Sequence, residues 1–160
     1  MFEQITPPVT INDPVQAAYQ WFVLLGRYCA AVDYDSNESI FAPDVVSFGT
    51  KSPIVSGLKN LRQQQWEGIW GNIADFQVQI DQLHAGGSGN NAWGIVPWTS
   101  TGFHQDGKYF DRPGRATTVL ERRDGVWLSV HTHFSLIPGC LLYTSPSPRD
   151  ATLSRMPSSA

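Results

Sequence analysis

Residues 115–139 read RATTVLERRDGVWLSVHTHFSLIPG, and this stretch decides the fold class. Two strand-like runs flank Asp124-Gly125, a pair that accepts positive φ and closes a tight hairpin. In the second run, apolar or methyl-bearing residues alternate with serine and histidine: Leu128, Val130, Thr132 and Phe134 against Ser129, His131, His133 and Ser135. Side chains two residues apart lie on one face of a strand. The stretch therefore predicts an antiparallel strand pair with one apolar and one polar face.

Upstream of the hairpin, the spacing of apolar residues is that of helices. Asp13-Pro14 is a helix-start signal, because Asp accepts a hydrogen bond from a free backbone N–H and Pro loses none in the first turn. One apolar stripe then predicts a helix of about 20 residues: Val15, Ala18, Phe22, Leu25, Cys29 and Val32. We also expect a short helix at 35–41, a strand at 45–49 and a long helix at 58–73, with the glutamines at 63–65 on its exposed face.

From residue 75 onward the spacing becomes that of strands. We expect strands at 76–83, 92–104, 108–121 and 126–137, separated by glycine-rich residues 86–91 and by turns at 106–107 and 124–125. Pro113-Gly114 predicts a bulge or bend within the third strand. Helices followed by an antiparallel meander predict an α+β domain with helices against one face of the sheet.

Composition argues against several classes of function. The net charge is −3, without a basic cluster, so we expect no nucleic-acid partner. No apolar stretch approaches the roughly 18 residues of a membrane helix, and residues 1–13 lack the order of a signal peptide. Cys29 is the sole cysteine before residue 140, which fits a reducing compartment and excludes a cysteine metal cluster. We therefore expect a cytoplasmic protein without cofactor, metal or membrane partner.

The residues after Gly139 differ in sequence character from the rest of the chain. Residues 140–150 resemble one reading frame of a sequencing-library adapter, and residues 154–160 resemble the flow-cell end of that adapter. We therefore expect two parts, a folded domain at 1–139 and a non-native disordered tail at 140–160. The alternative is a natural disordered tail, because Pro and Ser are abundant there.

Four stretches resemble the nuclear transport factor 2-like superfamily, and within it the SnoaL-like domains: GRYCAAVD at 26–33, FAPDVVSFG at 41–49, SGLKNL at 56–61 and RRDGVWLSVHTHFS at 122–135. The last is also similar to the end of the association domain of calcium/calmodulin-dependent kinases. The resemblance covers about residues 15–138. It implies a cone-shaped, curved antiparallel sheet wrapped around N-terminal helices, a pocket inside the cone, and a homodimer formed through the sheet. This fold serves isomerases, dehydratases, hydrolases and binding modules, so it does not specify the function.

The superfamily that the chain resembles includes enzymes, among them the ketosteroid isomerases. They use a carboxylate base and an oxyanion hole made of a tyrosine and a protonated aspartic acid. The resemblance places Tyr28 at the oxyanion tyrosine, the base at or near Gly49, and the second acid near Thr117 or Thr118. Only the tyrosine matches, which argues against isomerisation by that mechanism.

The histidines are the candidate proton carriers. His131 and His133 form an H-x-H pair on one strand face, which could hold a metal ion if a third ligand were present. They, or His104, could move a proton near neutral pH if the pocket reaches them, with Tyr28 polarising an oxygen. The alternative is structural: the apolar set faces the core, and the His/Ser set lines a dimer interface.

Aromatic residues give the stronger sign of a pocket. The chain has six tryptophans; the resemblance points Trp98 into the cone, and Trp66 and Trp70 lie one turn apart on the second long helix. Ligand pockets are typically apolar with a few placed polar groups. The alternative for each aromatic residue is ordinary core packing. The candidate ligand-binding residues are Phe48, Trp66, Trp70, Trp98, Arg115, Thr118 and Phe134.

Arg112 and Arg115 flank the bend at Pro113-Gly114. A bulge can turn a guanidinium toward a pocket rim, where it would bind a carboxylate. The more ordinary alternative is a solvated strand edge.

Two functions follow from the sequence. One is an isomerase- or lyase-type enzyme acting on a small, apolar, polyketide- or steroid-like molecule. The other is a non-catalytic ligand-binding or oligomerisation module.

Overall fold

Helix α1 (Pro14–Ala31) begins where the sequence predicts it, in a computed structural model that describes residues 4–139. The Asp13 carboxylate accepts a hydrogen bond from the backbone N–H of Val15 at 3.2 Å. The helix ends at Val32, which has a left-handed φ of 54° and donates its backbone N–H to carbonyl oxygens in the last turn of the helix. The apolar stripe is confirmed in its middle, whereas Val15 and Val32 are exposed because they lie at the helix ends. The tail predicted at 140–160 lies outside the described residues.

The second long helix is interrupted by a wider turn. It consists of α3 (Leu58–Leu61), a π-helical turn η1 (Arg62–Trp66), α4 (Glu67–Ile69) and a 3₁₀ turn η2 (Trp70–Asn72). A π turn inserts one residue into the helical repeat. As a result Gln65 and Trp66 are both buried. The prediction of an exposed glutamine face is therefore wrong for Gln65, which is 6% exposed.

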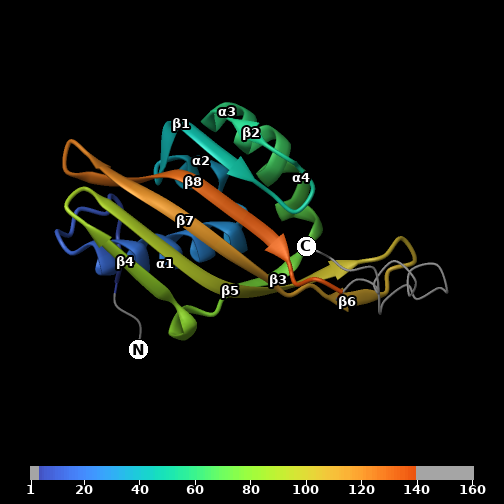
Figure 1. Cartoon of the computed structure of the whole chain (residues 1–160). Helices are drawn as coiled ribbons and strands as arrows, with labels where there is room; N and C mark the ends of the chain where they lie inside the picture. Colours follow the sequence, from blue (N-terminus) through green and yellow to red (C-terminus); the bar gives the residue numbers. More distant parts are fainter. Residues whose placement is uncertain (1–3, 140–160) are drawn as a thin grey trace, which may run out of the picture.

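The strands form one curved sheet in the order β2-β1-β8-β7-β5-β3, with β4 and β6 also paired to β5 (Figure 1). Their bounds are β1 (Phe41–Phe48), β2 (Val55–Ser56), β3 (Ala74–Val78), β4 (His84–Ser88), β5 (Asn91–Phe103), β6 (Tyr109–Asp111), β7 (Gly114–Arg123) and β8 (Val126–Leu136). The α+β fold and the predicted hairpin are confirmed; Asp124 and Gly125 have φ of 52° and 81°. The β1–β8 pair is parallel, which the expectation of an antiparallel sheet did not include.

Two of the predicted strands are divided. The 3₁₀ turn η3 (Ile80–Gln82) separates β3 from β4, and these two strands pair with different parts of β5. Residues 86–88, expected to be a break, belong to β4, and the chain turns only at Gly89-Asn90. The expected bend at Pro113 separates β6 from β7, so both strands can follow the long β5 as it curves.

A β-bulge in β8 changes which side chains face inward. His131 pairs with Val119 and Ser129 pairs with Leu120, so Val130 is an extra, unpaired residue. Before the bulge Trp127 and Ser129 are buried, and after it Thr132 is buried. The prediction of one unbroken alternation is therefore wrong before the bulge and correct after it.

The core lies between α1 and the inner face of the sheet, with α3 beside β1 (Figure 1). Trp21 is fully buried, donates its Nε1–H to the Ile40 carbonyl at 2.7 Å, and meets Phe22 and Phe41 edge-on. Trp127 donates to the Ile11 carbonyl at 2.7 Å and so fixes the segment before α1. No helix among residues 4–139 is long and apolar enough to span a membrane.

Candidate ligand-binding site

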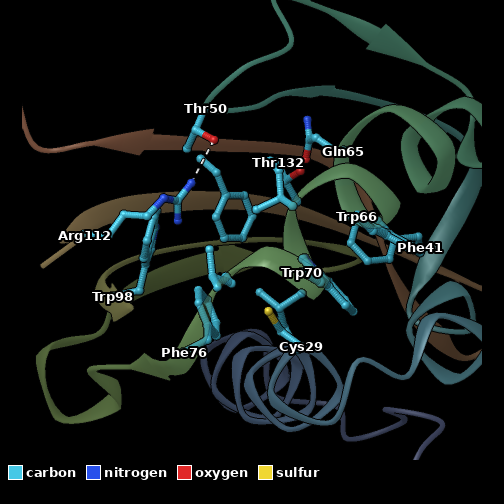
Figure 2. Close-up of a pocket in the computed structure, with 14 residues that line it drawn as sticks. Cys29, Phe41, Thr50, Gln65, Trp66, Trp70, Phe76, Trp98, Arg112 and Thr132 are labelled. Carbon is cyan, nitrogen blue, oxygen red and sulfur yellow. Dashed lines mark hydrogen bonds between the residues drawn. The ribbon is translucent and has the colours of Figure 1, made fainter. Parts of the chain in front are cut away.

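A hollow opens between α1, the π-helical segment and the inner face of the sheet (Figure 2). Its walls are mainly aromatic and aliphatic, with a few polar side chains. The lining residues are Leu25, Cys29, Phe41, Thr50, Gln65, Trp66, Ile69, Trp70, Ile73, Phe76, Trp98, Arg112, Thr132 and Phe134. Ligand sites are commonly apolar hollows with few polar groups, so this is the candidate site.

Three structural features shape the hollow. The π turn brings Gln65 and Trp66 inward together, and the bulge in β8 turns Thr132 and Phe134 toward the same space. The bend at Pro113 places Arg112 at the end of β6, where it is 8% exposed. These irregularities, rather than the regular elements, supply most of the polar lining.

The aromatic walls are tightly stacked. Trp66 and Trp70 lie parallel, with ring centroids 5.5 Å apart, and Trp70 stacks in turn on Tyr34. At the other end Trp98 packs against Phe76 at 5.5 Å and Phe134 at 6.2 Å. Figure 2 shows Arg112 and Trp98 at one end of the hollow and Trp66 and Trp70 at the other. Such flat walls suit a ring-bearing or otherwise apolar ligand.

The hollow is narrow and continues into a wider outer groove. The space open to water inside is about 50 Å³, enough for a few water molecules. The outer groove has a volume of about 300 Å³ and is lined by Lys51, Phe103 and Phe110 among others. Four residues border both spaces: Thr50, Ile69, Ile73 and Arg112. A ligand could therefore enter from solvent past Arg112.

Arg112 is the one charged residue that lines the hollow within residues 4–139. Its guanidinium donates to the Ser100 hydroxyl and to the Thr50 hydroxyl, each at 3.2 Å. It also lies over the Trp98 ring, 5.4 Å from the centroid. Burial lowers the pKa of Arg112, because desolvation disfavours its charged form. A guanidinium nevertheless stays protonated in proteins.

Gln65 lies where a catalytic carboxylate would be expected from the ketosteroid isomerases. A Cβ atom added to Gly49 would meet the Gln65 side chain, at 2.6 Å from Cδ. The base position implied by the resemblance is thus filled by an amide reaching over from the π turn. An amide does not accept a proton near neutral pH, so the isomerase base has no counterpart here.

Cys29 lies on the α1 side of the hollow (Figure 2). Burial raises the pKa of its thiol from 9.0 to about 12, and the nearby positive charge of Arg112 lowers it only in part. The thiol is therefore protonated at neutral pH. It neither neutralises Arg112 nor acts as a nucleophile, since the thiolate is the reactive form.

This pKa predicts a pH dependence of stability. The unfolded chain loses the thiol proton above pH 9.0 and the folded chain only near 12. Stability from this group is complete below pH 9 and falls as pH rises. Urea unfolding at several pH values between 9 and 11 measures the effect. In this range the free energy of unfolding should fall with pH more steeply in the wild type than in Cys29→Ala, by about 1.4 kcal/mol per pH unit. Equal slopes in the two proteins would mean that the folded state also releases this proton.

The residues predicted from the sequence separate into two groups. Trp66, Trp70, Trp98 and Phe134 line the hollow. The others lie elsewhere: Tyr28 and Thr118 in the core, Phe48, Arg115, His131 and His133 on the outer face of the sheet, and His104 in the turn after β5. The structure thus brings the predicted aromatic residues together and keeps the predicted proton carriers away from them.

The local contacts of the second group account for these positions. Burial raises the pKa of the Tyr28 hydroxyl, and Thr118 shares a hydrogen bond with the Ser129 hydroxyl at 3.0 Å. Phe48 meets His131 and His133 edge-on, each at 5.1 Å. His131 Nδ1 lies 2.7 Å from the Val46 carbonyl, so that nitrogen donates its proton.

The other two predicted side chains are near solvent. His104 packs on Phe110, with ring centroids 4.6 Å apart. Arg115 is exposed and donates to the Ser135 hydroxyl at 3.1 Å. Among residues 4–139, no three His, Cys, Asp or Glu side chains are grouped so that they could hold a metal ion.

Sequence reasoning left most of the polar lining out of the predicted site, although it named Arg112 as a residue that could bind a carboxylate at a pocket rim. Cys29 and Leu25 could have been found, since they lie on the predicted stripe of the first helix. Thr132 belongs to the inward set predicted for the last strand. The inward direction of the Gln65 side chain depends on a π turn, and that of Arg112 depends on a bend. The local spacing of apolar residues does not show which way side chains point at such irregularities.

Comparison with known proteins adds the family. Residues 19–139 match the SnoaL-like domain family. No curated protein matches the sequence. The fold is similar to that of a Xanthomonas campestris protein named as a proposed calcium/calmodulin dependent protein kinase II association domain (TM-score 0.67, 19% identity, covering 86% of this chain and 99% of that chain).

Two further solved structures share the fold. One is a nuclear transport factor 2-like superfamily protein from Salmonella enterica (TM-score 0.66, 17% identity, covering 76% of this chain and 89% of that chain). The other is a ketosteroid isomerase-like protein from Erwinia carotovora (TM-score 0.61, 14% identity, covering 78% and 94%). At such identities these structures support the fold alone. The family match spans most of the described residues, and the chain therefore belongs to the SnoaL-like domain family, with the nuclear transport factor 2-like fold.

Proposed function

We propose that this SnoaL-like domain is a ligand-binding module that holds a small, mainly apolar molecule in the hollow without converting it. The observation that supports this is the lining itself: stacked aromatic walls, and no side chain that exchanges protons near neutral pH among the described lining residues. The two titratable groups present, the Cys29 thiol and the Arg112 guanidinium, both hold their protons there.

The isomerase- or lyase-type hypothesis is less well supported. A general acid or base must lie within about 3 Å of the reacting atom, or be linked to it by one water. The predicted proton carriers Tyr28, His104, His131 and His133 do not line the hollow. Catalysis there would require a proton carrier from the ligand or from solvent.

Ligand binding and product analysis together test the proposal. We expect some members of a panel of aromatic acids, their amides and steroids to raise the melting temperature by about 10 °C at 100 times Kd, by mass action. The same compounds, incubated with the protein and examined by NMR, should remain unchanged. Consumption of a hit would favour the enzyme hypothesis instead. A panel that shifts neither the melting temperature nor tryptophan fluorescence would contradict the proposal.

We also propose a homodimer formed through the outer face of the sheet. Large apolar side chains are exposed on this face, including Trp93 at 44% and Ile95 at 40%. Ile95 belongs to a row across the sheet that runs His84–Ile95–Thr117–His133. Ile95→Asp would place a charge in this row, so we expect it to weaken the dimer at least 10-fold. Light scattering during gel filtration measures this, and a wild-type chain that is monomeric at high concentration would refute the dimer.

A further inference from the structure

Arg112 carries a buried positive charge with no acidic partner among residues 4–139. The ion pairs found there belong to Arg62 and Arg123, both near the surface. Arginine is almost never fully buried unless it is paired. Removing one partner from a buried charge costs several kcal/mol, so an unpaired one requires an explanation. A site for a negatively charged ligand group is one such explanation.

The neighbouring groups satisfy Arg112 only in part. The Ser100 and Thr50 hydroxyls accept from two of its nitrogens, whereas a guanidinium has five N–H groups. Both acceptors are neutral. The Cys29 thiol, which interacts electrostatically with Arg112, remains protonated because its pKa is about 12. The positive charge is therefore not neutralised by the surrounding protein.

A second donor lies beside Arg112, and this one has no acceptor among the described residues. Trp98 is 2% exposed, and its Nε1–H makes no hydrogen bond within the described residues. The Trp98 ring lies beneath the Arg112 guanidinium (Figure 2). Buried polar groups in proteins are usually hydrogen-bonded, so an unpartnered one points to a missing partner. Both side chains are donors, and the missing partner must supply acceptor atoms.

The route to Arg112 is also favourable for an anion. Arg112 borders both the hollow and the outer groove, and the outer groove contains Lys51. No acidic residue lines either space among the described residues. Positive charge at a narrow entrance attracts anions and repels cations.

We propose that the hollow takes a small aromatic carboxylate, with the carboxylate bound to Arg112 and the ring placed between the aromatic walls. A planar carboxylate accepts two parallel hydrogen bonds from a guanidinium. The free space of about 50 Å³ in the hollow is smaller than such a ligand, which would therefore extend past Arg112 into the adjoining outer groove of about 300 Å³. The proposal rests on the ligand-binding function above and specifies the chemical class of the ligand.

Matched probes test it, since benzoate and benzamide, or 2-naphthoate and 2-naphthamide, differ mainly in charge. In calorimetric titrations at pH 7 we expect the wild-type protein to bind each acid about 10- to 100-fold more tightly than its amide. Arg112→Met should reduce this preference to within about 3-fold. Arg122→Met is the matched control, because Arg122 lies over Trp127 at 5.2 Å, as Arg112 lies over Trp98, but outside the hollow. It should keep the full preference.

The possible outcomes separate this proposal from the function it rests on. Equal binding of acid and amide by the wild type would overturn the carboxylate but leave the binding function intact. Retention of the preference by a folded Arg112→Met would also overturn it. Binding of none of the four probes would contradict both. If Arg112→Met does not fold, the ratio of acid to amide affinity in the wild type still tests whether the site selects a carboxylate. The conservative variant Arg112→Lys, which keeps the charge but loses the planar fork, then tests whether Arg112 is the residue that binds it.

Discussion

Trp21→Ala is expected to lower the free energy of unfolding by about 4 kcal/mol. Trp21 is fully buried between α1 and β1, and alanine would leave a cavity among Phe22 and Phe41. It would also remove the donor to the Ile40 carbonyl, at the start of the strand that pairs with β8. A loss of this size is a large fraction of the stability of a domain, commonly about 5–15 kcal/mol.

Urea unfolding followed by far-UV circular dichroism measures this loss without relying on tryptophan fluorescence. Tyr109→Ala is the control, because Tyr109 is 74% exposed, and its replacement should change stability by no more than about 0.5 kcal/mol. A loss below about 2 kcal/mol for Trp21→Ala would mean that the surroundings collapse into the vacated space.

Gly114→Ala is expected to destabilise the fold by about 3 kcal/mol, because the added methyl group has no room. It would overlap the Trp98 indole and lie 2.6 Å from the Ser135 carbonyl oxygen of the neighbouring strand. The indole or the strand must move, and the indole forms one wall of the hollow. We therefore expect weaker binding of aromatic probes together with the loss of stability.

Gly71→Ala provides the matched comparison. No atom lies within 4 Å of the methyl group it would add. Its unfolding free energy should stay within about 1 kcal/mol of the wild type, and probe affinity should not change. Chemical denaturation of both variants, with probe titrations beside it, measures the difference. Similar behaviour of the two would show that Trp98 has space to move without cost.

The regular parts of the fold could be predicted from the sequence because their signals are local. The start of α1 is set by Asp13 and Pro14, and the β7–β8 turn by Asp124 and Gly125. The resemblance added the curved sheet around the helices. The parallel β1–β8 pair could not be predicted locally, since it joins segments about 85 positions apart, as the Ser47–Thr132 hydroxyl contact illustrates.

The candidate site was harder to predict than the fold because irregular backbone defines it. The alternation of residues along the last strand placed Thr132 and Phe134 correctly on the inner face of the sheet, but only because both follow the bulge at Val130. For Arg112 the sequence suggested a carboxylate contact or a solvated edge, and it suggested the same for Arg115. The two arginines are distinguished by contacts with residues distant in the sequence. Arg112 donates a hydrogen bond to Thr50, 62 residues earlier, whereas Arg115 donates one to Ser135 near solvent.

The stacked pair Trp66–Trp70 has an optical consequence. Two indoles held 5.5 Å apart are close enough for their electronic transitions to couple, and the coupling gives a paired positive and negative band in circular dichroism when the two transition dipoles are at an angle to each other. Both rings line the hollow. A bound molecule that tilts either ring would alter this band, so circular dichroism would report binding in the hollow without an added label.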